Sequence, residues 1–332
     1  MKKQTLLSIS MLALLVSAAG SPLPGITVPA YAAADELPTL ADLDKTVVAA
    51  ATRALQELAE GKAIVLDDIK GQNKEHWVLA AKDDRGEVLV NKTSGEIVSV
   101  RVRFKLDEVN ESLQAAVEST LKDLDAKGAL RIDQVERVKW QKESAWKFTG
   151  DNVQVAIDPE TGKLLHASAE YELGQVDPEI VQAAQEKINQ LSGGQSLVLS
   201  PSVTLYQNPQ KHIDTLWAFG DKDGNYAVGI GANTGKVVSV KMASQVAGEN
   251  FVWENDIPQV FAQPFYTKEK AVAAAGPAVK QHFQIDLTGY DASVQFDTYT
   301  FTKPGMPTVI AKINKQGTFW DFLVTPENRL AN

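Results

Sequence analysis

Residues 157–165 read IDPETGKLL, and two other stretches carry the same pattern, NKTSGEIVS at 91–99 and GANTGKVVS at 231–239. Each copy has apolar residues at alternate positions before a polar turn and two apolar residues soon after it. This is expected for a half-buried strand that turns back on itself. The pattern therefore predicts three β-hairpins with a glycine at the same place in each turn: Gly95, Gly162 and Gly235.

The turn chemistry is clearest in the middle copy. Asp158 suits the first turn position because its carboxylate accepts hydrogen bonds from the backbone ahead of it, and Pro159 presets φ for the next position. Gly162 suits the left-handed conformation that closes the turn onto the returning strand. The other copies depart from this pattern, with Asn91 and Gly231 in the place of the aspartate.

A tryptophan precedes every hairpin, at Trp77, Trp146 and Trp217. These positions are about 70 residues apart, a domain-sized period. We interpret all three as core residues, because each fills the same position in a unit whose sheet must pack on a helix. Trp140 and Trp253 lie outside this position. They are therefore the candidate binding residues, with wall polysaccharide as the ligand that an exposed aromatic ring would suit.

A helix opens each unit. The first is predicted over about 43–60, and the second carries one apolar stripe through 113–124. The third begins at Asp177, a helix-capping residue followed by proline. The fourth begins near Thr267, and Pro277 is expected to bend it.

The last unit is degenerate. Residues 294–301 are rich in strand formers, but their apolar side chains change face, so the register is undefined. TPENRL at 325–330 resembles the turn sequence with one residue missing. The predicted fold class is α+β, with tandem repeats of one helix packed on a small antiparallel β-sheet. The predicted repeat units are 35–105, 106–172, 173–245 and 246–332.

The helix, the Trp-x-Phe strand and the V-x-V-D-x-x-T-G-x-[IV] hairpin together resemble the PepSY family. In tandem they are closest to the YcdB/YcdC repeated domain of exported Gram-positive bacterial proteins. PepSY modules occur in propeptides of thermolysin-type metalloproteases and in exported regulators. The resemblance covers about residues 40–332 and implies control or inhibition of a protease, or assistance to its folding. It offers no catalytic residues to carry over.

Residues 1–32 have the pattern of an export signal, with Lys2 and Lys3 before an apolar run and small residues at Ala30 and Ala32. We place cleavage after Ala32 or Ala34; the rival interpretation is an uncleaved anchor. A second apolar stretch of membrane length does not follow. The chain has no cysteine, so an exported form would be held together by packing alone.

The formal net charge is −9, and it becomes −11 once the two lysines of the signal are removed. An acidic, evenly charged chain argues against nucleic acid as a partner. None of the four histidines forms a metal-binding pair, and the nucleotide and hydrolase motifs are missing. DKDGN at 221–225 lacks the glycine and glutamate that an EF-hand loop needs at its sixth and twelfth positions. No metal, cofactor or catalytic residue is expected.

These observations predict a non-catalytic protein that is secreted or attached to the cell wall. The first hypothesis is a binding or regulatory protein whose partner is an exported protease or another extracellular protein. Exposed sheet edges offer a physical route, because an extended peptide can add to them as a further strand. The alternative is a structural protein of the cell envelope that binds a wall polymer.

Overall fold

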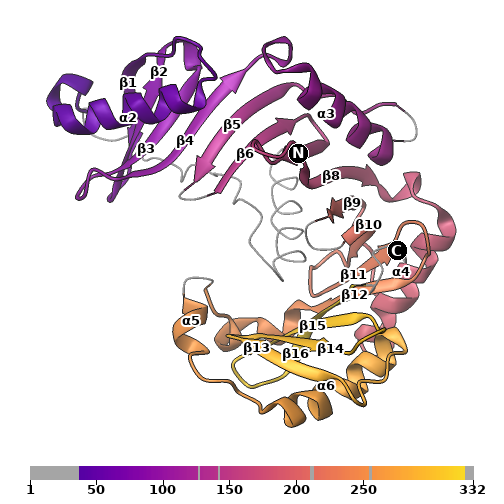
Figure 1. The fold of residues 1–332 in the computed structure, drawn as a ribbon. Coiled ribbons are helices and arrows are strands. Elements are labelled where there is room, and N and C mark those ends of the chain that lie inside the picture. The colour runs from indigo at the N-terminus through magenta and orange to yellow at the C-terminus, as the bar shows by residue number, and fades with distance from the viewer. Residues whose placement is uncertain (1–36, 126–127, 141–142, 210–212, 254–255, 326–332) are drawn as a thin grey trace. The chain divides into compact units, whose positions relative to one another are not determined.

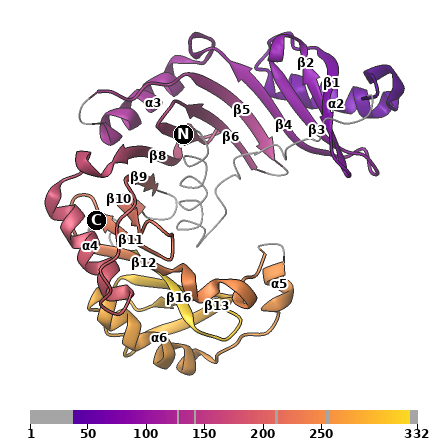
Figure 2. The same cartoon turned by 180° about the vertical axis from the view of Figure 1, so that it is seen from behind.

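The computed structural model describes residues 37–125, 128–140, 143–209, 213–253 and 256–325 (Figures 1 and 2). The chain divides into two compact units whose boundary falls between Ala167 and Ser168. We call the described residues up to 167 the N-terminal unit and those from 168 the C-terminal unit. The predicted export signal at 1–32 and most of TPENRL lie outside the described residues. Within the described part of the chain, no helix is long and apolar enough to cross a membrane.

The predicted fold class is wrong in its central feature. The described strands form one antiparallel sheet of 16 strands, in the order β1 to β12 followed by β16, β15, β14 and β13. Helices are few beside this sheet, so the molecule is sheet-rich and does not consist of separate small sheets, each with its own helix. In the C-terminal unit the last four strands join in reverse, because β12 pairs with β16.

The physical reason for the continuous sheet is visible between β4 (Ile97–Phe104) and β5 (Gln134–Trp140). These strands would be the outer strands of two neighbouring modules, and each would then present a row of unpaired backbone groups. Instead they pair with each other from Ser99–Trp140 to Phe104–Val135, over six residue pairs. Pairing satisfies the backbone groups of both strands and merges the predicted modules into one sheet.

The N-terminal unit combines two helices with a meander of strands. Helix α2 (Lys45–Leu58) packs on β3, β4 and β5, and α3 (Glu111–Leu124) packs on β7. Both helices lie where the apolar patterns predict them. The remaining strands are β1 (Leu66–Gln72), β2 (His76–Ala81), β3 (Gly86–Asn91), β6 (Glu143–Thr149) and β7 (Val153–Ile157), and β8 (Leu164–Glu172) crosses the boundary.

The C-terminal unit has its own apolar core beneath α4 (Pro178–Leu191) and α6 (Lys268–Phe283). Asp177 caps α4 by accepting from the backbone N–H of Glu179 at 2.8 Å, as predicted. Helix α6 packs on β12, β13 and β16 (Figures 1 and 2). The other elements are β9 (Ser202–Asn208), β10 (Ile213–Gly220), β11 (Tyr226–Gly231), β12 (Val237–Met242), α5 (Ile257–Val260), β13 (Asp291–Gln295), β14 (Thr298–Thr302), β15 (Thr308–Ile313) and β16 (Phe319–Thr325).

The three hairpin turns share one backbone shape. Gly95, Gly162 and Gly235 have φ of 70°, 66° and 62°, in the left-handed region. The side-chain oxygen of Asp158 accepts from the N–H groups of Glu160 and Thr161 at 2.9 and 2.8 Å.

In the other two copies, the residue in the place of this aspartate determines how the turn is closed. Asn91 offers the same kind of oxygen, which accepts from Thr93 and Ser94, both at 2.9 Å. Gly231 has no side chain, and its turn is closed by the backbone bond from Gly235 N–H to Gly231 O at 2.9 Å.

The segment 294–301 is a hairpin and not the single strand that its composition suggested. Strand β13 ends at Gln295, Phe296 and Asp297 form the turn, and β14 starts at Thr298. The turn explains the change of face in the apolar pattern, because the chain reverses where one strand was expected to continue.

Candidate functional site

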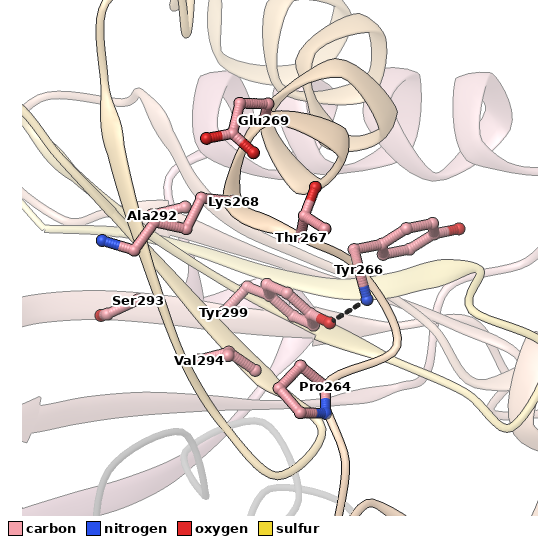
Figure 3. Close-up of a pocket in the computed structure, with 9 residues that line it drawn as sticks. All are labelled: Pro264, Tyr266, Thr267, Lys268, Glu269, Ala292, Ser293, Val294 and Tyr299. Carbon is pink, nitrogen blue, oxygen red and sulfur yellow. Dashed lines mark hydrogen bonds between the residues drawn. The ribbon is translucent and has the colours of Figure 1, made fainter.

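A pocket of about 380 Å³ lies where the start of α6 meets the strand β13 (Figure 3). Its size falls in the range of protein sites that hold a small molecule or a side chain. Apolar and aromatic groups supply most of the wall, and four polar or charged residues come from the start of α6 and from β13. The lining residues are Pro264, Tyr266, Thr267, Lys268, Glu269, Ala292, Ser293, Val294 and Tyr299.

Tyr299 of β14 forms the floor of this pocket. It is almost completely buried, and its hydroxyl accepts a hydrogen bond from the backbone N–H of Tyr266 at 2.8 Å (Figure 3). Burial raises the pKa of Tyr299, so the ring carries a neutral hydroxyl at physiological pH. The floor is therefore an uncharged aromatic surface.

Tyr266 is held in place from two further directions. Its hydroxyl donates to the backbone carbonyl of Gly317 at 2.9 Å. Its ring is stacked on Phe319, with centroids 6.0 Å apart and planes inclined by 16°. A side chain with these contacts gives the pocket a preformed wall, which reduces the ordering cost of binding.

The rim of the pocket carries charge. Lys268 at the start of α6 pairs with Asp291 at the start of β13, with Nζ and Oδ1 3.1 Å apart. The hydrogen bond from Lys268 lowers the pKa of Asp291, so this carboxyl group is ionised at neutral pH. Both groups are well exposed, so solvent screens their attraction and the pair adds little to the stability of the fold. Glu269 adds an exposed carboxylate next to it.

Strand β13 leaves one edge of the sheet open beside the pocket. Within the described residues it has a single strand neighbour, β14, and its five residue pairs with β14 run without a register shift. Gln295 and Thr298 flank a two-residue turn. The two residues that flank such a turn are hydrogen-bonded to each other through their backbones. Because bonded and non-bonded pairs alternate along an antiparallel ladder, the backbone groups of Ala292 and Val294 point away from β14.

The strand at the other end of the order, β1, is built differently. Its pairing with β2 contains two register shifts, one between Leu66 and Asp68 and one between Ile69 and Gly71. It also carries charged side chains, among them Lys70, which pairs with Glu87 at 2.8 Å. Bulges and charges are the devices that protect an edge strand from pairing with another chain. Strand β13 has no bulge, and its single charged residue is Asp291.

A second, larger pocket of about 760 Å³ lies between α4 and the segment 196–199. Its walls are largely aliphatic, and Val198 is among the most exposed apolar residues of the chain. It does not border a sheet edge, because its lining residues belong to α4 and to the segments just before α4 and β9.

The two candidate binding tryptophans lie in different units. Trp140 is half-buried at the end of β5, opposite Ser99. Trp253 is 70% exposed and Phe251 is 46% exposed. The rings of this pair meet edge to face with centroids 4.9 Å apart. The pocket contains neither tryptophan.

The three tryptophans of the repeated position differ in environment. Trp146 is buried, with its ring 4.9 Å from that of Phe104. Trp77 and Trp217 are half-buried, beside Lys92 and Tyr171 respectively. Asp221 of the DKDGN stretch accepts from the backbone N–H of Tyr226 at 2.6 Å, and so helps to close the turn between β10 and β11.

Sequence reasoning missed the pocket because it placed the candidate binding residues at Trp140 and Trp253, and neither of them lines it. Tyr266, Tyr299 and Phe319 lie in the unit that departs most from the repeat. One signal was available: ten of the 18 tyrosine and phenylalanine residues of the chain fall in residues 261–322.

Comparisons with known proteins assign no family to this chain. No family model matches it, and no curated protein matches it. A crystal structure of a DUF2874 family protein from Bacteroides uniformis is similar over 38% of this chain and 88% of that chain, at 15% identity and a TM-score of 0.24. A likeness of this size assigns neither fold nor function. The resemblance to PepSY modules stays a prediction.

Proposed function

We propose that the protein is an exported binding protein that captures an extended peptide segment by adding it to the sheet at β13. The observation that carries the proposal is the pairing of an open, unbulged edge with a preformed aromatic pocket on the same strand. Strand addition supplies backbone hydrogen bonds, and a pocket beside the edge selects alternate side chains. An exported protease or another extracellular protein is the proposed source of the segment.

The wall composition defines what the pocket would accept. Val294 and the rings of Tyr266 and Tyr299 give it an apolar interior, which favours a bulky apolar side chain of the ligand. The ligand backbone would bond to the outward N–H and C=O groups of Val294 and to the C=O of Ala292, since the N–H of Ala292 already donates to the carboxylate of Asp291. Binding thus needs both an extended backbone and an apolar anchor.

Proline substitution at the edge tests this proposal. Peptides are first selected from a random heptapeptide display library on the chain from Ala33 to Asn332. Their affinity is then measured by fluorescence anisotropy for the wild type, for Val294→Pro and for Val294→Thr. Proline removes the outward N–H that the ligand would use, whereas threonine keeps the N–H and most of the side-chain shape.

We expect Val294→Pro to weaken binding at least tenfold, and Val294→Thr to stay within about threefold of the wild type. Asp67→Pro, in a bulge of β1, is the control and should bind as the wild type does. Circular dichroism checks that each variant is folded. A library that yields no peptide, or peptides that bind Val294→Pro unchanged, would refute strand addition at β13. Assays of secreted host proteases with and without the chain then test modulation.

The exposed pair of Phe251 and Trp253 favours a second candidate function, binding of a neutral wall polysaccharide. Lysine and arginine are missing from residues 242–267, so this surface does not suit an anionic polymer. An exposed aromatic ring that is surrounded by polar residues without positive charge suits the stacking of a sugar ring. Sedimentation with purified wall glycan tests the candidate. Trp253→Ala should abolish co-sedimentation while Trp140→Ala should not, and equal retention of both variants would remove this candidate.

A further inference from the structure

Phe296 occupies an unusual backbone position for its type. It forms the turn between β13 and β14 together with Asp297, and its φ is 55°, in the left-handed region. Its large apolar side chain is also 41% exposed to solvent. Bulky residues rarely adopt this conformation, and asparagine or glycine is the usual choice in a two-residue hairpin turn.

Local folding does not explain the choice of phenylalanine. The left-handed backbone brings Cβ close to the following carbonyl, and asparagine would relieve this strain while keeping the turn. Exposing a large apolar side chain to water is also unfavourable in free energy. Strained residues of this kind concentrate at binding sites, because the surrounding contacts hold them in place.

Position in the sheet suggests which ligand the residue serves. Phe296 directly follows the last residue of β13, and the pocket lies along the same strand at Ala292 to Val294. An extended segment added to β13 would run past both. Each residue of a strand advances by about 3.4 Å, and side chains two or four residues apart lie on the same face.

We propose that Phe296 is a specificity-determining contact for the segment bound at β13. The preferred ligand is an extended peptide with two bulky apolar side chains at an even spacing of two or four residues, one in the pocket and one against the Phe296 ring. This inference rests on the proposed function and adds the second anchor to it.

Substitution of the turn residue separates binding from folding. The probe is the tightest heptapeptide from the display selection, synthesised with a fluorescent label, together with two versions in which one apolar anchor is replaced by serine. Affinity is measured by anisotropy for the wild type, Phe296→Asn and Phe296→Tyr. Urea unfolding of each variant confirms that it is fully folded at the assay temperature.

We expect Phe296→Asn to bind at least fivefold more weakly than the wild type, and Phe296→Tyr to bind within twofold of it. The peptide that lacks the second anchor should bind the wild type and Phe296→Asn equally. Unchanged affinity of Phe296→Asn, while Val294→Pro still abolishes binding, overturns the role of Phe296 and leaves strand addition standing. If Phe296→Asn and Val294→Pro both bind the peptide as tightly as the wild type does, the proposed function itself is refuted.

Discussion

The hydroxyl group of Tyr299 on β14 accepts a hydrogen bond from the backbone N–H of Tyr266 at 2.8 Å, just before α6 begins. This bond links the sheet to the loop that forms the pocket wall. Because Tyr299 is buried, the N–H of Tyr266 has little chance of a water partner if the hydroxyl is removed.

Tyr299→Phe should therefore cost about 1–2 kcal/mol of unfolding free energy, since it leaves a part-buried donor without its acceptor. It should also loosen the pocket wall and weaken peptide binding. Tyr290→Phe is the matched control, because its hydroxyl donates to the carbonyl of Pro307 at a longer distance of 3.2 Å. Urea unfolding of both variants measures the difference, and equal losses would contradict a special role for Tyr299.

Gly317→Ala should destabilise the protein more than Gly235→Ala does. Both glycines have positive φ, of 80° and 62°, so alanine is strained at either position by about 1 kcal/mol. A Cβ at Gly317 would also lie 2.1 Å from Cε1 of Phe265, whereas one at Gly235 would meet nothing within 4 Å. The comparison of unfolding midpoints isolates the displacement of the Phe265 ring, and a Gly235→Ala midpoint as low as that of Gly317→Ala would contradict it.

Acid should destabilise the core of the C-terminal unit through His282. Burial and, to a smaller extent, the nearby charge of Lys187 together lower the pKa of His282 to about 4. Its ring lies against Phe322, with centroids 6.4 Å apart. The unfolded chain binds a proton near pH 6.5 and the folded chain only near 4. The stabilisation is thus fully present above pH 6.5 and is lost as pH falls toward 4.

The expected result is that the melting temperature of the wild type falls between pH 7 and pH 5 by more than that of His282→Leu. Scanning calorimetry at both pH values measures the two changes, and the variant removes the titrating group while keeping an apolar side chain. Parallel decreases in both proteins would show that His282 does not govern the acid response.

Replacing Asp158 by asparagine should leave the stability of the protein nearly unchanged, whereas replacing it by alanine should lower that stability. Asp158 accepts two backbone hydrogen bonds, and Asn91 makes the same pair of bonds in the first hairpin. Asp158→Asn should stay within about 0.5 kcal/mol of the wild type, and Asp158→Ala should lose about 1 kcal/mol. Chemical denaturation measures both, and a neutral alanine variant would show that Gly162 and the backbone suffice, as they do at Gly231.

Local features of the fold could be predicted from local sequence. The apolar stripe over 113–124 marked α3, and Asp177 marked the start of α4, because helix periodicity and capping depend on neighbouring residues. The continuous sheet could not be predicted in this way. The pairing of β4 with β5 brings together strands separated by residues 105–133, and no local pattern encodes which strand an edge will meet.

The candidate site was hidden for a related reason. The turn at Phe296 and Asp297 lacks the asparagine and glycine that identify a two-residue hairpin, so β13 and β14 appeared as one strand. With that hairpin unrecognised, neither the open edge nor the position of Tyr299 beneath it could be inferred. Phe296 departs from the residue preferences of hairpin turns, and for that reason the turn was not predicted from the sequence. In our proposal the same residue contacts the ligand.

The reversed order of the last four strands has a consequence for how the chain is assembled during synthesis. Strand β16 is made after β13, β14 and β15, yet it is the strand that joins them to β12. A ribosome that still holds residues 319–325 therefore keeps the final meander from docking. Until those residues are released, one edge of β12 remains unpaired and open to pairing with another chain.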